Sequence, residues 1–297
     1  MMERSRETTL TRMLTDDFSS PRPQETRVLM GDPEFFDVEN VINPFMAGNL
    51  GQVDKKRARK QWEELRETYR NLGFEVLTAD AVPGFPDYVF MANQSFPWLT
   101  RQGELRFVLS KMACESRVGE VEHLNAWYTG LGMETVRLPG EAAFEGMGDS
   151  CWLPQQWAIL GGYGFRTSAS AYDALEKLLE VPVHRVQLVH PHFYHLDTCL
   201  SAVHSQCALF VPEAFTPAGV QTLHQCFDEL IPVPLNEASE SLSCNGHSPD
   251  GKHFIVQRGA PVTCARVKSA GLEVIEVDTS EFIKSGGSVY CMKLMLP

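Results

Sequence analysis

The sequence lacks any apolar run long enough to span a membrane. A transmembrane helix needs about 20 consecutive apolar residues, and no segment of the chain approaches that length. The N-terminal stretch is polar and contains no apolar core of the kind that a secretory signal requires. The sequence therefore predicts a cytoplasmic protein with no membrane partner.

Paired cysteines are also lacking. No two cysteines form a Cys-x-x-Cys pair, and without a secretory signal we expect them to be free thiols. The run from His190 to His195 is the only dense cluster of metal-binding residue types, and it contains no cysteine pair. We therefore expect no metal site and no cofactor. The cysteines are Cys114, Cys151, Cys199, Cys207, Cys226, Cys244, Cys264 and Cys291.

Basic charge is scarce. The chain carries 26 lysines and arginines against 38 aspartates and glutamates, which gives a formal net charge of −12. A protein of this sign is repelled by nucleic acid and by anionic membrane surfaces. The balance instead suits a small cationic molecule as the partner.

A glycine-rich phosphate loop is missing as well. The run Gly161 to Gly164 precedes Phe165-Arg-Thr-Ser168 rather than a periodic helical segment. This disfavours a nucleotide-binding fold. A doubly wound parallel sheet stays open as an alternative, because it too alternates strands and helices.

What the sequence does contain is a repeated unit of strand, strand, helix and strand. In the first helix, Trp62, Leu65 and Tyr69 recur at the spacing of one helical face, and a strand follows Gly73 directly. The helix–strand junctions fall near 73, 132, 181, 231 and 271, a spacing typical of solenoids and propellers. The expected helices are 54–71, 121–132, 171–180, 217–230 and 261–271. The strands that directly follow these helices are expected at 74–77, 133–138, 183–189, 231–235 and 272–277. Between each of these strands and the next helix lie short apolar runs that also read as strands, such as 88–91, 107–110, 157–160, 207–211 and 254–257.

The ends of the chain bound this repeat. Residues 1–25 form a polar arm that ends at Pro21-Arg-Pro23, and 26–297 are expected to form one catalytic domain. At the other end, Gly286 and Gly287 permit a tight turn. The run 288–296 has the composition of a strand, with Cys291 near its start. The segment 239–251 is expected to be a lid or a surface loop.

Polar residues recur at corresponding places in the segments that join the strands. Each has an ordinary interpretation: Asp149 as a turn residue, His195 as a satisfied core histidine, Cys291 as a small buried hydrophobe. If the repeat closes into a propeller, the same end of every unit meets at one axis, and these residues share one pocket. The residues are Asp87, Asn93, Glu145, Asp149, His195, Asp197 and Cys291.

Together these residue types suit chemistry at a guanidinium group. A thiolate at Cys291 is a nucleophile, and His195 can move protons. A guanidinium is planar and permanently charged, and Glu145 and Asp197 can hold its N–H groups. Arginines grip carboxylates with two hydrogen bonds, so Arg117 and Arg166 are candidates for binding an α-carboxylate, although a surface role stays open for both. Asn43, before Pro44, is either a turn residue or a ligand contact.

The motifs that contain these residues jointly resemble the guanidine-modifying (pentein, amidinotransferase) superfamily. That superfamily includes arginine deiminases, dimethylarginine dimethylaminohydrolases and bacterial arginine dihydrolases. The resemblance runs from about residue 26 to the C-terminus, in order. The motifs are Val41–Pro44, Pro86–Asn93, Phe144–Asp149, Gly162–Thr167, His195–Asp197 and Ser285–Cys291.

The resemblance implies a five-bladed ββαβ propeller of the α/β class with pseudo-fivefold symmetry around a central active site. It also implies roles for the site residues. Cys291 would be the nucleophile and His195 the general acid and base. Glu145 and Asp197 would contact the guanidinium group. Arg117, Arg166 and Asn43 would contact the α-groups.

Two positions indicate which member it resembles. The carboxylate of Asp197 can accept hydrogen bonds from unsubstituted N–H groups, so plain arginine fits better than methylated arginine. Asn93 stands where arginine deiminases have an aspartate; because it is uncharged and both donates and accepts, it suits citrulline as well as arginine. The chain thus resembles an arginine dihydrolase that gives ornithine, carbon dioxide and ammonia through a Cys-thiouronium intermediate. A dimethylargininase, an arginine deiminase, an amidinotransferase and a non-catalytic binding protein stay open, as does a homo-oligomer.

Overall fold

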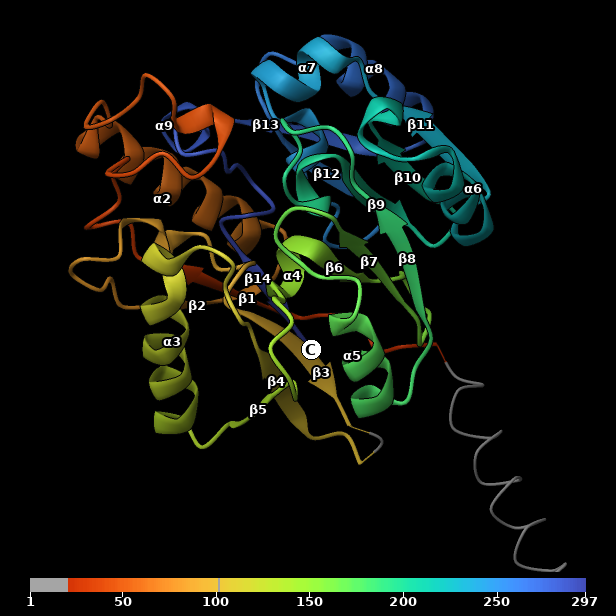
Figure 1. Cartoon of the computed structure of the whole chain (residues 1–297). Coiled ribbons are helices and arrows are strands. Elements are labelled where there is room, and N and C mark those ends of the chain that lie inside the picture. The colour runs from red at the N-terminus through yellow and green to blue at the C-terminus, as the bar shows by residue number, and fades with distance from the viewer. Residues whose placement is uncertain (1–20, 101) are drawn as a thin grey trace, which may run out of the picture.

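The structure, a computed structural model, describes residues 21–100 and 102–297. The first twenty residues of the predicted polar arm lie outside the described part. Within it, the chain is an α/β protein built from five units, each with a small sheet (Figure 1). No helix of the described part is both long and apolar enough to cross a bilayer.

Four units follow one pattern of strand, strand, helix and strand. In the second unit, the first two strands pair antiparallel from Ser95 opposite Leu109, and the second and third pair parallel, as in Val108 opposite Val136. A parallel pair needs a long crossover, which the helix provides. The units are β14 (Leu294–Leu296), β1 (Arg27–Gly31), α2 (Lys55–Asn71) and β2 (Glu75–Ala79); β3 (Ser95–Leu99), β4 (Leu105–Leu109), α3 (Val118–Gly130) and β5 (Glu134–Arg137); β6 (Ser150–Trp152), β7 (Ile159–Tyr163), α5 (Ala171–Leu179) and β8 (Val183–Gln187); β9 (Leu200–His204), β10 (Cys207–Phe210), α6 (Pro217–Cys226) and β11 (Glu229–Pro232).

The remaining unit has two full strands, β12 (His253–Gln257) and β13 (Glu273–Val277), joined by α8 (Pro261–Ser269). His247 forms an isolated antiparallel bridge with Ile255, which takes the place of the first strand. The first unit is completed by the C-terminus, because β14 pairs antiparallel with β1, with Arg27 opposite Leu296. Both ends of the described chain therefore belong to one sheet.

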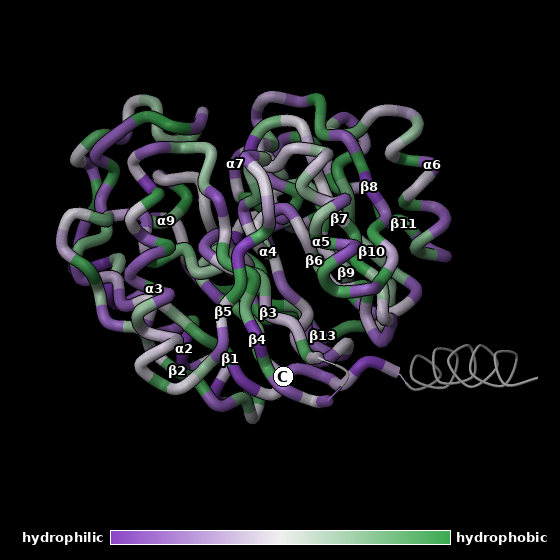
Figure 2. Tube along the Cα trace, turned by 60° about the horizontal axis from the view of Figure 1, so that its bottom comes forward, coloured by the Kyte–Doolittle hydropathy of each residue, from purple (hydrophilic) through white to green (hydrophobic). Residues whose placement is uncertain are grey.

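The helix α2 illustrates why these segments fold as the pattern predicts. Asp54 caps its N-terminus by accepting hydrogen bonds from the backbone N–H groups of Lys56 and Arg57. Trp62 and Tyr69 are buried on its inner face, which packs beside β2. Gly73 follows in a left-handed conformation with φ of 91°, so the chain can turn straight into the strand. Figure 2 shows the hydrophobic residues concentrated in the strands, while outer helices such as α6 alternate between polar and apolar residues.

The structure confirms the five helix–strand pairs, and it corrects two of the expected strands. The run 88–91 belongs to the 3-10 helix η2 (Pro86–Val89), and the strand begins only at Ser95. The run 288–296 is a turn until Leu294, because the N–H groups of Ser288 and Cys291 bond to the side chain of Asn245 instead of to a neighbouring strand.

Short helices precede the first strand of the units and pack against one another. Contacts join α4 to η4 and η4 to η6. These helices therefore bring together the segments in which the sequence predicts the site. They are η2, α4 (Gly146–Asp149), η4 (Leu196–Thr198) and η6 (Ser243–Asn245). A further short helix, η3 (Glu115–Arg117), directly precedes α3, and η1 (Pro44–Met46), η5 (Pro212–Ala214), α7 (Leu235–Glu240) and α9 (Ser280–Ile283) lie elsewhere.

Candidate active site

His195 and Glu145 form a buried pair at the ends of two of these short helices. His195 precedes η4 and Glu145 precedes α4, and the His195 Nε2 lies 2.6 Å from Glu145 Oε2. The other carboxylate oxygen, Oε1, accepts a hydrogen bond of 2.9 Å from the N–H of Ala113. Although burial raises the pKa of Glu145, the hydrogen bond and charge of His195 and the charge of Arg166 hold it at about 2. Glu145 is therefore a carboxylate, and it orients the imidazole.

The thiol of Cys291 lies among polar groups. Its Sγ donates to Asp197 Oδ2 at 3.1 Å and accepts from Asn245 Nδ2 at 3.1 Å. Burial and the Asp197 carboxylate raise the pKa of Cys291 well above its ordinary value. Burial likewise raises the pKa of Asp197, to about 7, against the hydrogen bond from Cys291 and the charge of Lys293. A cation that approached this pair would favour the thiolate.

Asn245 is a site residue that the sequence analysis placed only within a lid or loop. It is fully buried, and its Oδ1 accepts from the N–H groups of Ser288 and Cys291. Its Nδ2 donates to the carbonyl of Asp197 at 2.9 Å as well as to the thiol. The short polar run Ser243-Cys-Asn245 before His247 corresponds to the other strand-end motifs and is the one signal for it in the sequence.

Arg117 is held by an ion pair within its own helix segment. Its guanidinium donates to Glu120 in several bonds, the shortest of 2.8 Å, and both side chains are buried. The Arg117 Nη1 also donates to Asn93 Oδ1 at 2.9 Å. The Nδ2 of Asn93 is buried and has no partner among the described residues. Asn93 therefore offers a donor that a ligand can use.

Arg166 faces the site from a different direction. Its Nη2 donates to the carbonyl of Ile42 at 2.8 Å, and its Nη1 lies 3.4 Å from Glu145 Oε2. The guanidinium lies over the ring of Tyr194, 5.0 Å from its centroid. The Tyr194 hydroxyl donates to the carbonyl of Gly286 at 2.8 Å. These contacts tie the arginine to the glycine turn before Cys291.

A small cavity, which we call the Arg166 hollow, lies between these groups. Its volume is 260 Å³ with the solvent at its mouth included. A Cβ on Gly287 would lie 2.3 Å from the ring of Phe90, so glycine is needed where this turn borders the hollow. The lining residues are Ile42, Asn43, Met46, Asp87, Phe90, Asn93, Arg117, Arg166, Tyr194, Ser285, Gly286, Gly287 and Cys291.

Most of the predicted site residues thus lie together, in two layers. Cys291, Asn93, Arg117, Arg166 and Asn43 line the hollow. His195, Glu145 and Asp197 do not line the hollow and form the second layer. His195 bonds to Glu145, and Asp197 accepts from the thiol of Cys291. Asn43 also has a structural part: its Oδ1 caps η1 and its Nδ2 donates to the carbonyl of Ser285 at 3.0 Å.

Known proteins are similar to this chain in sequence and in fold. The family model "N,N dimethylarginine dimethylhydrolase, eukaryotic" matches residues 33–296. A dimethylarginine dimethylaminohydrolase of Mycobacterium tuberculosis is 34% identical over 92% of this chain and 86% of its own. The bifunctional arginine dihydrolase/ornithine cyclodeaminase ArgZ of Synechocystis is 30% identical over 91% of this chain, which spans 37% of that protein. The N-terminal domain of ArgZ, as a cysteine-to-serine mutant bound to substrate, superposes with a TM-score of 0.84 at 29% identity, over 91% of this chain and 97% of the domain.

These findings define the class of protein. The chain is a member of the guanidine-modifying superfamily and a hydrolase of guanidino C–N bonds. Within that superfamily, it belongs to the family of eukaryotic dimethylarginine dimethylhydrolases that the model describes.

Proposed function

We propose that this chain hydrolyses arginine at the guanidino carbon through a covalent thiouronium on Cys291. The observation that carries the proposal is the thiol of Cys291, 3.1 Å from the Asp197 carboxylate and at the wall of a hollow that two arginines line. Asp197 would hold the guanidinium, and Arg117 and Arg166 would hold the α-carboxylate with help from Asn43. His195, oriented by Glu145, would be the general acid and base.

The steps follow from these positions. The guanidinium cation takes the place of the thiol proton beside Asp197, the proton leaves to solvent, and Cys291 is left as a thiolate. The sulfur attacks the guanidino carbon, a terminal C–N bond breaks, and His195 supplies the proton with which ammonia leaves. Water then gives its proton to His195 and attacks the carbon, and the C–S bond breaks to release citrulline.

We further propose a second round on citrulline. The ureido group is neutral, and a site that held it with two carboxylates would discriminate against it. Asn93 has no charge, and its unpartnered Nδ2 can donate to the ureido oxygen. The second round expels ammonia and leaves a carbamate, which loses carbon dioxide to give ornithine. The similarity to the arginine dihydrolase ArgZ supports this choice.

Hydrolysis of dimethylarginine is the second candidate. The family model and the Mycobacterium tuberculosis relative favour it. The position of Asp197 argues against dimethylarginine as the substrate. The carboxylate accepts hydrogen bonds from N–H groups of the guanidinium, and two methyl groups would remove two of these donors.

The proposed architecture is one catalytic domain over 26–297 in which the five units form the blades of a propeller. The pairing of the C-terminal β14 with β1 supports this, because it joins the two ends of the described chain in a single blade. Contacts of α4 with η4, and of η4 with η6, support the arrangement of successive units around the site.

A product assay on arginine, citrulline, dimethylarginine and agmatine tests the function. We expect ornithine and two ammonia per arginine, consumption of citrulline supplied alone, and no product from Cys291→Ser, whereas Cys264→Ser on α8 stays active. Stoichiometric citrulline would mean a deiminase. Dimethylamine from dimethylarginine would refute the substrate choice. Transfer of the amidino group to an added amine would mean a transferase, and no turnover would mean a binding protein.

A further inference from the structure

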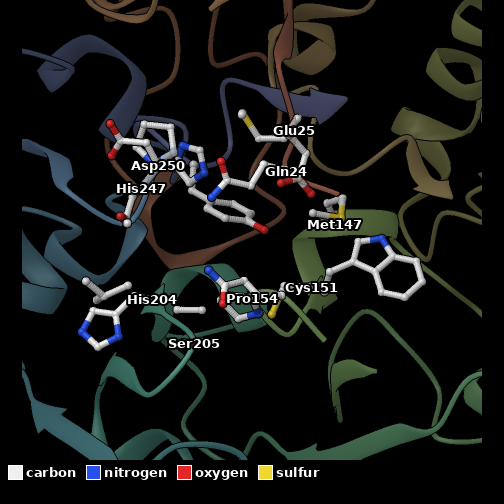
Figure 3. Close-up of a pocket in the computed structure, with 18 of the residues that line it drawn as sticks. Gln24, Glu25, Met147, Cys151, Pro154, His204, Ser205, His247 and Asp250 are labelled. Atoms are coloured by element: carbon white, nitrogen blue, oxygen red, sulfur yellow. The ribbon is translucent and has the colours of Figure 1, made fainter. Parts of the chain in front are cut away.

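A second and larger cavity adjoins the site, and we call it the Lys293 cavity. Its volume is 980 Å³ with the solvent at its mouth included, and it shares no lining residue with the Arg166 hollow. In Figure 3, His204 and Ser205 lie across it from Glu25 and Met147. Both Asp197 and Lys293 line it. Apart from Asp197, the residues that line this cavity have no role in the proposed reaction.

Lys293 is a buried lysine that forms no ion pair with another described residue. Its side chain is 1% exposed, and its Nζ lies 3.3 Å from the centroid of the Tyr290 ring. No carboxylate of the described residues lies within 4.0 Å of it. Burial of an ammonium group is costly, and contact with a single aromatic ring offsets only part of that cost. The position therefore calls for a function beyond packing.

The hydrogen bond between Cys291 and Asp197 connects the two cavities. Cys291 lines the Arg166 hollow, and Asp197 lines the Lys293 cavity. The Asp197 Oδ1 is buried and has no partner among the described residues. Lys293 follows Cys291 by two residues, so one short segment carries both the thiol and the cation.

We propose that Lys293 is a positioning residue that acts across its cavity on Asp197 and Cys291 and favours the carboxylate and thiolate forms that the reaction needs. The inference rests on the proposed function, since it takes Cys291 as the nucleophile. A positive charge near a thiol and a carboxyl group stabilises both anions, and the low polarity of a buried site strengthens the effect.

The charges around Lys293 agree with this role. Burial lowers the pKa of Lys293 to about 7, against the carboxylates of Glu25 and Asp197 and the thiols of Cys291 and Cys151. On the segment before β12, burial and the charge of Lys293 lower the pKa of His247, so that imidazole is neutral. Arg22 also lines the cavity, but it is paired with Glu25. Among the described residues, Glu25 and Asp197 are thus the carboxylates whose charges act on Lys293, and Glu25 is itself paired with Arg22.

The rate of Cys291 alkylation by iodoacetamide, followed over pH by mass spectrometry of the Cys291 peptide, tests the proposal. In Lys293→Met we expect alkylation below about pH 7, where Lys293 carries its charge, to slow about tenfold, and the difference from wild type to vanish at higher pH, where the lysine is neutral. Lys293→Arg keeps the charge and should keep the rate below pH 7. Lys268→Met removes an exposed cation from α8 and is the control for net charge.

The outcomes separate this proposal from the proposed function. An unchanged alkylation rate below pH 7 in folded Lys293→Met, with Cys291→Ser inactive, would overturn the role of Lys293 alone. Full activity in Cys291→Ser would instead overturn the proposed function. Circular dichroism checks folding, and Lys293→Gln is the second neutral variant should the methionine variant not fold. A lysine needed only for packing would change the melting temperature and leave the alkylation rate below pH 7 unchanged.

Discussion

The Nε2 of His195 lies 2.6 Å from Glu145 Oε2, and Arg166 Nη1 lies 3.4 Å from the same oxygen. One carboxylate oxygen thus contacts two groups of the site and fixes the imidazole ring. With Nε2 engaged, Nδ1 is the nitrogen of His195 that remains to exchange protons with a ligand. The pair is buried, so its geometry does not depend on solvent.

Replacing Glu145 with glutamine should lower kcat far more than it changes KM. The imidazole loses the carboxylate that orients it, and general acid–base catalysis contributes about 100-fold or more. Steady-state kinetics on arginine measure the change. Glu141→Gln, which removes an exposed carboxylate nearby in the chain, is the control. Equal losses in both variants would remove Glu145 from the mechanism.

Glu145 should also make stability depend on pH in the acid range. Its pKa in the fold, about 2, lies below its ordinary 4.5. The ionised group therefore stabilises the fold above pH 4.5, and this contribution is lost as the pH falls through about 2. The gap corresponds to about 3 kcal/mol. Urea unfolding at pH 6 and at pH 2 should show wild type losing about that much more than Glu145→Gln.

Asn245 should be needed for both stability and thiol reactivity. Asn245→Ala leaves the N–H groups of Ser288 and Cys291 and the carbonyl of Asp197 without partners, and each such group costs about 1–3 kcal/mol. Chemical unfolding should show a loss of several kcal/mol. Asn245→Asp keeps the acceptor but places a second carboxylate beside the thiol, so alkylation of Cys291 should slow. Faster alkylation in the aspartate variant would contradict this.

The repeated unit was predictable from the sequence because its signals are local. The helical spacing of Trp62, Leu65 and Tyr69 and the turn at Gly73 specify a helix and a following strand without reference to the rest of the chain. The strand-end motifs were predictable for the same reason. Their repetition at corresponding places indicated that His195, Glu145 and Asp197 belong to one site.

The errors lie where distant contacts decide the backbone. Residues 288–292 have strand composition, yet the N–H groups of Ser288 and Cys291 bond to the side chain of Asn245, which is 46 residues away from Cys291. The apolar run before Asn93 starts at Pro86, which begins a 3-10 helix because proline suits its first turn. Lys293 carried no local signal either, because a lysine in an apolar segment gives no indication that it is buried.

Asn93→Asp should change the product. A carboxylate at this position favours the charged guanidinium and disfavours the neutral ureido group, so citrulline should accumulate at the expense of ornithine. The arginine contact should survive, because an aspartate oxygen can still accept from Arg117 Nη1. Chromatography of the amino acid products against time measures the ratio. Asn71→Asp at the exposed end of α2 is the control, and an unchanged ratio in Asn93→Asp would remove this residue from substrate choice.

Glu120 competes with any ligand for Arg117, so its removal should have opposite effects on stability and binding. The ion pair is buried, and loss of one partner costs about 3–5 kcal/mol. Glu120→Gln should therefore unfold at lower urea concentration. In the folded variant Arg117 is free of its strongest partner, and the KM for arginine should fall while kcat changes little. If KM instead rises with kcat unchanged, Glu120 serves to aim Arg117 at the ligand. The KM of agmatine, which has no α-carboxylate, is the control, because it should change in neither case; the direction of the change in the KM of arginine separates the two results.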